Sequence, residues 1–108
     1  MAFKSYHNIN SATDGTTVTL IRQGESAGNL KSIVIVSVDT AANSCALFLQ
    51  NDTELVPYYI LGKTSLPAGA TLLLDSDDML AFNNSSSGYS LYLQMYDATT
   101  KLNVLLKK

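Results

Sequence analysis

Hydrophobic and polar residues alternate in short segments along most of this chain, and turn-forming residues separate the segments. The clearest alternation lies in Tyr89–Tyr96, where Leu91 and Leu93 share one side of the pattern and Tyr92 and Tyr96 share the other. Successive side chains of a β-strand point to opposite faces of its sheet. The spacing therefore predicts a strand with one apolar face and one face that carries tyrosines.

The same pattern predicts about eight strands and no helix. Leu30–Val38 contains four consecutive β-branched residues, which is typical of a central strand covered on both faces. No long window has apolar residues at the three- and four-residue spacing of an amphipathic helix. The predicted strands are Thr16–Arg22, Leu30–Val38, Ser44–Gln50, Val56–Leu61, Ala70–Leu74, Met79–Asn83, Tyr89–Tyr96 and Leu102–Lys107.

Tight polar corners join these strands. Pro67 fixes a backbone angle suited to a turn, and Gly69 accepts the left-handed conformation. Asp75–Asp78 makes a second corner, because short polar side chains bond their own backbone. Strands joined in this way predict an all-β fold, a single-domain antiparallel β-sandwich of jelly-roll type. With 108 residues, the chain has room for one hydrophobic core.

Residues 1–15 are expected to form an N-terminal arm, followed by the β-sandwich domain at residues 16–108. The apolar side chains of Phe3, Tyr6 and Ile9 are spaced too irregularly for a helix, and turn-forming residues follow them. Such an arm docks on a neighbouring subunit or on the domain's own sheet, or it frays. As anchors of a docked arm, these three residues are candidate protein-interface residues.

Charge is scarce in this sequence. Charged residues make up 15% of the chain and apolar residues 46%, which suggests that another subunit covers part of the surface. A net charge of −2 and a pI near 5.0 argue against binding to nucleic acid. The first ten residues lack a signal-peptide core, and no apolar run is long enough to cross a membrane. We expect a soluble protein, made in the cytoplasm.

Residues with catalytic chemistry are few. His7 is the only histidine and Cys45 the only cysteine, so neither an intrachain disulfide nor a cysteine-cluster metal site is possible. His7 lies in the expected arm, where a solvated side chain is the usual finding. Cys45 lies on a predicted inward face and is interpreted as a small core hydrophobe. We therefore expect no nucleophile–base pair.

Carboxylates and glycines do not form a recognisable site either. The corner Asp75–Asp78 offers oxygen ligands to calcium but lacks the glycine and the downstream glutamate of a helix–loop–helix calcium site, so it is interpreted as a solvated turn. Glu25 and Glu54 lie in expected loops with no sign that they converge, as a glycoside hydrolase would require. Gly24 is not followed by the Lys-Ser/Thr of a phosphate-binding loop. No catalytic residue, metal or cofactor is predicted, and an enzyme is not expected.

Tyrosines are the remaining candidates for binding. Tyr92 and Tyr96 project from the face opposite the leucines, and Tyr58 and Tyr59 are adjacent, so that one of them points outward. Tyrosines are enriched at protein interfaces because they bury a large area and keep a polar tip. We predict protein contacts at Tyr92 and Tyr96. The alternatives are sugar stacking, with Tyr58 and Tyr59 as candidates, and packing under loops.

The middle of the chain contains an ordered series of strand and corner motifs, IVIVSV, CALFLQ, YYIL, LPAG, TLLLD and DMLAF. They lie at Ile33–Val38, Cys45–Gln50, Tyr58–Leu61, Leu66–Gly69, Thr71–Asp75 and Asp78–Phe82. As a series, which covers about half of the chain, they resemble small structural proteins of tailed-bacteriophage virions.

This resemblance implies a non-enzymatic virion protein, most simply a capsid decoration (cement) protein that binds and stabilises the shell. The implied partner is the major capsid protein or another virion protein, and such proteins are commonly homo-oligomers, with a trimer favoured. The implied location is the virion, on the capsid surface, after synthesis in the host cytoplasm. A neck, tail, baseplate or fibre component is the first alternative. A carbohydrate-binding or receptor-binding β-sandwich module is the second.

Overall fold

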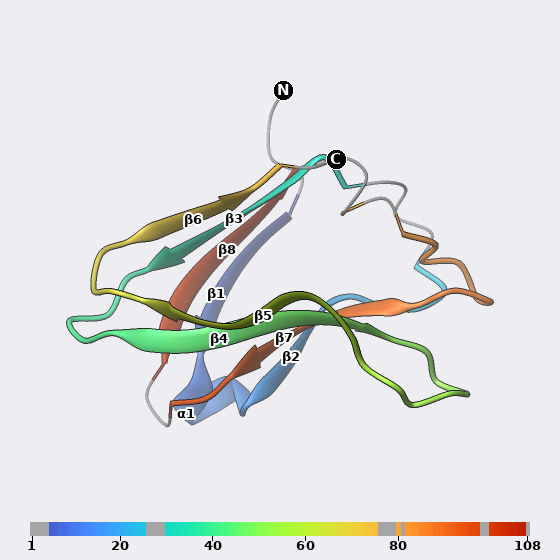
Figure 1. Ribbon diagram of the computed structural model, residues 1–108, viewed down its shortest axis with the longest axis horizontal. Helices are drawn as coiled ribbons and strands as arrows, with labels where there is room; N and C mark the ends of the chain where they lie inside the picture. Colours follow the sequence, from blue (N-terminus) through green and yellow to red (C-terminus); the bar gives the residue numbers. More distant parts are fainter. Residues whose placement is uncertain (1–4, 26–29, 76–79, 81, 98–99, 108) are drawn as a thin grey trace.

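The computed structural model of the protein (Figure 1) describes residues 5–25, 30–75, 80, 82–97 and 100–107. These residues form two four-stranded antiparallel sheets packed face to face, which confirms the predicted all-β sandwich. Sheet A contains, in spatial order, β1 (Ser5–Asn10), β8 (Lys101–Lys107), β3 (Ser32–Ser37) and β6 (Thr71–Leu74). Sheet B contains, in spatial order, β2 (Thr17–Ile21), β7 (Ser90–Met95), β4 (Asn43–Gln50) and β5 (Tyr58–Leu66).

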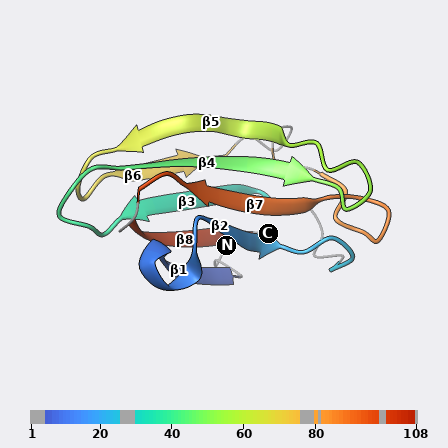
Figure 2. The same ribbon diagram turned by 90° about the horizontal axis from the view of Figure 1, so that it is seen from below.

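The strand order is that of a jelly roll. Along the chain the strands change sheet at each connection except the one from β4 to β5, which pair with each other as a hairpin. The resulting orders, β1-β8-β3-β6 and β2-β7-β4-β5, contain two interlocked Greek keys. In the view of Figure 2 the strands of both sheets run along the length of the molecule, and Figure 1 shows that those of sheet A are tilted relative to β4 and β5.

The N-terminal segment belongs to the sandwich. Residues 5–10, which we expected in an arm, form the edge strand β1 and pair with β8 from Ser5 to Asn10. This is the outcome in which the segment docks on the domain's own sheet. A four-residue helix, α1 (Ser11–Asp14), follows, although the sequence predicted no helix. The side chain of Asn10 caps α1 by accepting from the amide of Ala12 at 3.1 Å.

The predicted strand at Met79–Asn83 is wrong for the part that the structure describes. Leu80, Phe82 and Asn83 are outside any strand. The amide of Phe82 donates to the carbonyl of Leu80 at 3.1 Å, a tight local bond that replaces pairing with a neighbouring strand. Leu80 is completely buried in the core. The apolar residues here fill the space between the sheets at one end of the sandwich rather than extend a sheet.

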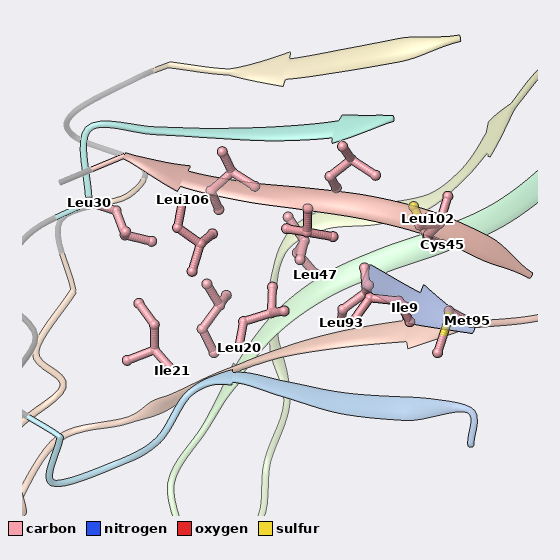
Figure 3. Packing of buried hydrophobic residues seen from close by; sticks show 14 of the residues in the cluster. Ile9, Leu20, Ile21, Leu30, Cys45, Leu47, Leu93, Met95, Leu102 and Leu106 are labelled. Atoms are coloured by element: carbon pink, nitrogen blue, oxygen red, sulfur yellow. The ribbon is translucent and has the colours of Figure 1, made fainter. Parts of the chain in front are cut away.

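The core lies between the two sheets (Figure 3). Leu91 and Leu93, which share one side of the alternation in Tyr89–Tyr96, are buried, and so are the other residues on the inner faces of β7 and β8, Met95, Leu102, Val104 and Leu106. On β3, Ile33 and Ile35 are completely buried, while Val34 and Val36 on the outer face are only half-buried. The prediction that this strand is covered on both faces thus holds on its inner face alone.

Candidate interaction surfaces

The described residues contain no group of three or more histidine, cysteine or acidic side chains that could hold a metal ion. No helix among them is long and apolar enough to span a membrane. In the corner Asp75–Asp78 only Asp75 is described, and it is exposed. The candidate sites are therefore surfaces and hollows.

Cys45 and His7 are the only cysteine and the only histidine of the sequence. Cys45 is completely buried, as expected, and burial raises the pKa of its thiol to about 11. His7 pairs with the inward-facing Val104 and is half-buried rather than solvated. Burial lowers the pKa of His7, while the charge of Glu25 opposes that shift. The two residues lie on strands of different sheets, His7 on β1 and Cys45 on β4.

The outer face of sheet A carries an apolar row that crosses all four strands. Tyr6 pairs with Leu105, Leu105 with Val34, and Val34 with Leu73. Directly paired residues project from the same face of a sheet. We call these four residues the A-face row. Its two ends are the most exposed, with Tyr6 at 68% and Leu73 at 55%.

A second row runs beside it and carries no charge. It consists of Asn8, Asn103, Val36 and Thr71, which pair in that order from β1 to β6. Between the two rows lies a hollow of about 420 Å³, lined in part by Tyr6, Asn8 and Leu105. No described helix or strand covers this face (Figures 1 and 2). The two rows are therefore uncharged and open to a partner, while Lys101 and Lys107 project from the same face at the two ends of β8.

The outer face of sheet B carries an aromatic row. Phe48 on β4 pairs with Tyr59 on β5 and with Tyr92 on β7. The ring centroids of Phe48 and Tyr92 are 5.3 Å apart with an interplanar angle of 25°, and those of Phe48 and Tyr59 are 5.4 Å apart at 49°. We call these three residues the B-face row. Phe48, at the centre of the row, is 8% exposed, whereas Tyr59 is 50% exposed.

Polar contacts hold the B-face row in place. The hydroxyl groups of Tyr59 and Tyr96 both donate to Oε1 of Gln94, at 3.2 and 3.3 Å. The ammonium group of Lys63 lies 4.7 Å from the ring centroid of Tyr96, a cation–π contact. Desolvation and the neighbouring Tyr59 raise the pKa of Tyr96. The two bonds to Gln94 hold the hydroxyl groups of Tyr59 and Tyr96 beside each other.

Several predicted interface residues fall on these faces, and one does not. Tyr6 lies in the A-face row, Tyr92 lies in the B-face row, and Tyr96 is beside the latter. Ile9 is wrong as an interface residue: it is 4% exposed and packs in the protein's own core, because it pairs with the inward-facing Leu102. Phe3 lies outside the described residues.

Tyr58 and Tyr59 separate onto opposite faces of sheet B. Tyr59 pairs with Phe48, which faces outward, and Tyr58 pairs with Leu49, which packs against the core. The two side chains are equally exposed, at 49% and 50%. Tyr58 therefore lies at the open end between the two sheets, where it lines a separate hollow with Tyr89. The two tyrosines cannot stack together on one sugar.

Sequence reasoning missed the apolar residues of the A-face row other than Tyr6. Their signal is present in the runs of consecutive apolar residues around Val34, Leu73 and Leu105. We interpreted such a run as a strand that is covered on both faces. In the structure sheet B covers only the inner face of sheet A. The remaining apolar positions mark the uncovered face.

The chain matches no protein-family model and none of the curated proteins with which it was compared.

Proposed function

We propose that this protein is a non-enzymatic structural protein that bridges other protein subunits by binding them on both outer faces of its jelly roll. The observation that carries this proposal is the pair of apolar rows on opposite faces, the A-face row and the B-face row. Exposed apolar patches rimmed by polar residues are typical of protein-contact sites. Two such patches on opposite faces allow one molecule to join two neighbours.

The strand pattern supports the same conclusion. Val34 and Leu105 occupy the two central strands of sheet A, yet they are only half-buried on its outer face. Their burial against a partner is favourable, at about 25 cal/mol for each Å² of apolar surface removed from water. A partner protein on the outer face of sheet A would cover the second face of the strand, as the apolar run Ile33–Val36 predicts.

The biological setting that we propose is the virion of a tailed bacteriophage, and it rests on the resemblance of the Ile33–Phe82 series. In that setting the partner is the major capsid protein, and the protein acts as a decoration protein on the capsid surface. Each contact is modest, but contacts repeated by symmetry add up along the shell. A trimer stays a prediction from the resemblance. A neck, tail or baseplate position uses the same two faces.

Occupancy on capsids that lack the protein tests this function. Leu73→Ser removes one end of the A-face row, and Tyr59→Ser removes one end of the B-face row. Each change is expected to lower occupancy about tenfold or more, the effect of losing a well-packed contact residue. Bound copies are measured by sedimenting particles with purified protein, and circular dichroism checks the fold.

The chain offers a matched control for each variant. Leu55→Ser changes a leucine that is at least as exposed as Leu73, 65% against 55%, in the connection between β4 and β5. Tyr58→Ser changes the tyrosine next to Tyr59, on the inner side. Both controls should bind like the unchanged protein. Full occupancy of both face variants would refute the proposal, and loss in one alone would refute bridging through two faces.

A further inference from the structure

A hollow at one end of the sandwich stands apart from both outer faces. It is lined by Leu49, Tyr58, Phe82, Asn83 and Tyr89 and has a volume of about 290 Å³. These residues come from β4, β5 and the segment that leads into β7, on the right of Figure 1. We call it the end hollow. Nothing in the proposed bridging function uses it.

Aromatic rings form the walls of the end hollow. The rings of Tyr58 and Tyr89 meet edge to face, with centroids 6.0 Å apart and an interplanar angle of 85°. Phe82 and Leu49 complete a lining that is mainly apolar. In the B-face row the rings stack on one another, whereas an edge-to-face pair around a hollow leaves ring surface accessible to a ligand.

Polar groups stand beside these walls. The hydroxyl of Tyr58 donates to Oε2 of Glu54 at 3.2 Å, and this bond to the carboxylate raises the pKa of Tyr58. Glu54 and Asn83 are both exposed. Oδ1 of Asn83 accepts from the amide of Ser85 at 3.0 Å, so Nδ2 of Asn83 and Oε1 of Glu54 are the side-chain atoms that can exchange water for a ligand. An aromatic wall with a carboxylate beside it suits a neutral ligand that has an apolar face and hydroxyl donors.

The rim is held in place by Asn51. Its Nδ2 donates to the carbonyl of Gly88 at 2.6 Å, which joins the β4–β5 connection to the segment before β7. Its Oδ1 accepts from the amides of Thr53 at 2.7 Å and Glu54 at 3.3 Å. Both sides of the end hollow are therefore fixed before a ligand arrives, which lowers the cost of ordering them on binding.

We propose that the end hollow binds a single pyranose ring of a carbohydrate. The C–H face of the sugar packs against the rings of Tyr58 and Tyr89, and its hydroxyl groups bond to the carboxylate of Glu54 and the amide of Asn83. The volume lies at the lower end of the range for small-molecule sites, so one ring fits rather than an extended chain. The carboxylate disfavours anionic sugars and favours neutral ones.

An NMR titration with neutral methyl glycosides tests this site. The probes are the methyl glycosides of glucose, galactose, mannose and N-acetylglucosamine, each added at millimolar concentration to ¹⁵N-labelled protein. At least one should shift the amide signals of residues 51–58 and 82–89 in a saturable way. Tyr58→Ala should abolish these shifts, and Tyr58→Phe should weaken binding several-fold because it keeps the ring and removes the bond to Glu54.

Tyr59→Ala is the matched control, because Tyr59 is adjacent, equally exposed and on the opposite face. It should bind the glycoside like the unchanged protein. The proposal is overturned if none of the four glycosides shifts these signals, or if Tyr59→Ala abolishes the shifts equally. It is also overturned if cyclohexane-methanol titrates the site and no glycoside does, since the hollow would then be an apolar side-chain site.

The two proposals fail separately. Tyr58→Ala should leave occupancy on capsids unchanged, and Tyr59→Ala should lower it. A variant that loses glycoside binding but attaches normally to capsids has a changed end hollow. A variant that binds the glycoside but attaches poorly has a changed outer face.

Discussion

The hydroxyl of Ser11 accepts a hydrogen bond from the amide of Thr100 at 2.7 Å, which joins residues that are 89 positions apart. The amide of Ser11 donates in turn to the carbonyl of Thr100 at 2.9 Å. The Ser11 hydroxyl also donates to the carbonyl of Asp97 at 3.0 Å. Both residues are buried, so this reciprocal pair ties the start of α1 to the connection between β7 and β8.

Ser11→Ala should lower the free energy of unfolding by about 1–3 kcal/mol, because it leaves the buried amide of Thr100 without its acceptor. Urea denaturation followed by circular dichroism measures the change. Ser65→Ala, at an exposed serine of β5, should stay within about 0.5 kcal/mol of the unchanged protein. Equal stabilities for the two variants would contradict this role of Ser11.

Gly88→Ala should be strongly destabilising. A β-carbon at this position would collide with the carbonyl oxygen of Asn83 and lie 2.6 Å from its carbonyl carbon. That carbonyl accepts from the amide of Tyr89 at 2.7 Å and cannot move without breaking the turn. We expect a loss of about 1–3 kcal/mol or more in thermal unfolding. Gly62→Ala meets no atom within 4 Å and should be neutral or slightly stabilising; a similar loss there would refute the steric explanation.

The buried thiol of Cys45 should make the protein less stable in alkali. Its pKa is raised from 9.0 to about 11, so the unfolded chain releases this proton first. The stability is intact below pH 9 and falls as the pH rises from about 9 to about 11. Cys45→Ala should show a flatter decline over that window in urea denaturation at each pH. Identical pH profiles for the two proteins would contradict the prediction.

The half-buried His7 should make the protein less stable in acid. Burial lowers its pKa below 6.5, and its Nε2 is buried with no hydrogen-bond partner among the described residues. The unfolded chain takes up this proton first, so stability is present above pH 6.5 and falls as the pH decreases below it. His7→Gln should remove part of that decline. An unchanged slope between pH 7 and pH 5 would show that other groups cause it.

Much of the fold could be predicted because apolar residues at every second position of a strand mark its buried face. In β7 and β8 every second residue is a leucine, valine or methionine, and each of these positions is buried. The sequence misled in two segments, for different reasons. Residues 5–10 look irregular because Tyr6 and Asn8 face solvent on an edge strand. Leu80 and Phe82 look like part of a strand, but Leu80 is buried in the core and Phe82 packs against it.

The candidate sites were harder to predict, because they depend on which strands become neighbours. Tyr92 was found from its own strand, but its partner Phe48 is 44 positions earlier in the sequence, and only the register of β4 against β7 brings them together. Likewise Tyr58 and Tyr59 were both outward candidates. Which of them faces the aromatic row and which faces the end hollow follows from pairing with β4.

The position of β8 has a consequence for how the protein is made. It is the last of the eight strands to leave the ribosome, yet it lies in the interior of sheet A, hydrogen-bonded to β1 on one side and to β3 on the other. Until residues 101–107 have been synthesised, β1 and β3 lack their common neighbour, and the nascent chain cannot close this sheet. Folding is therefore expected to be late and slow, as for chains dominated by distant pairings.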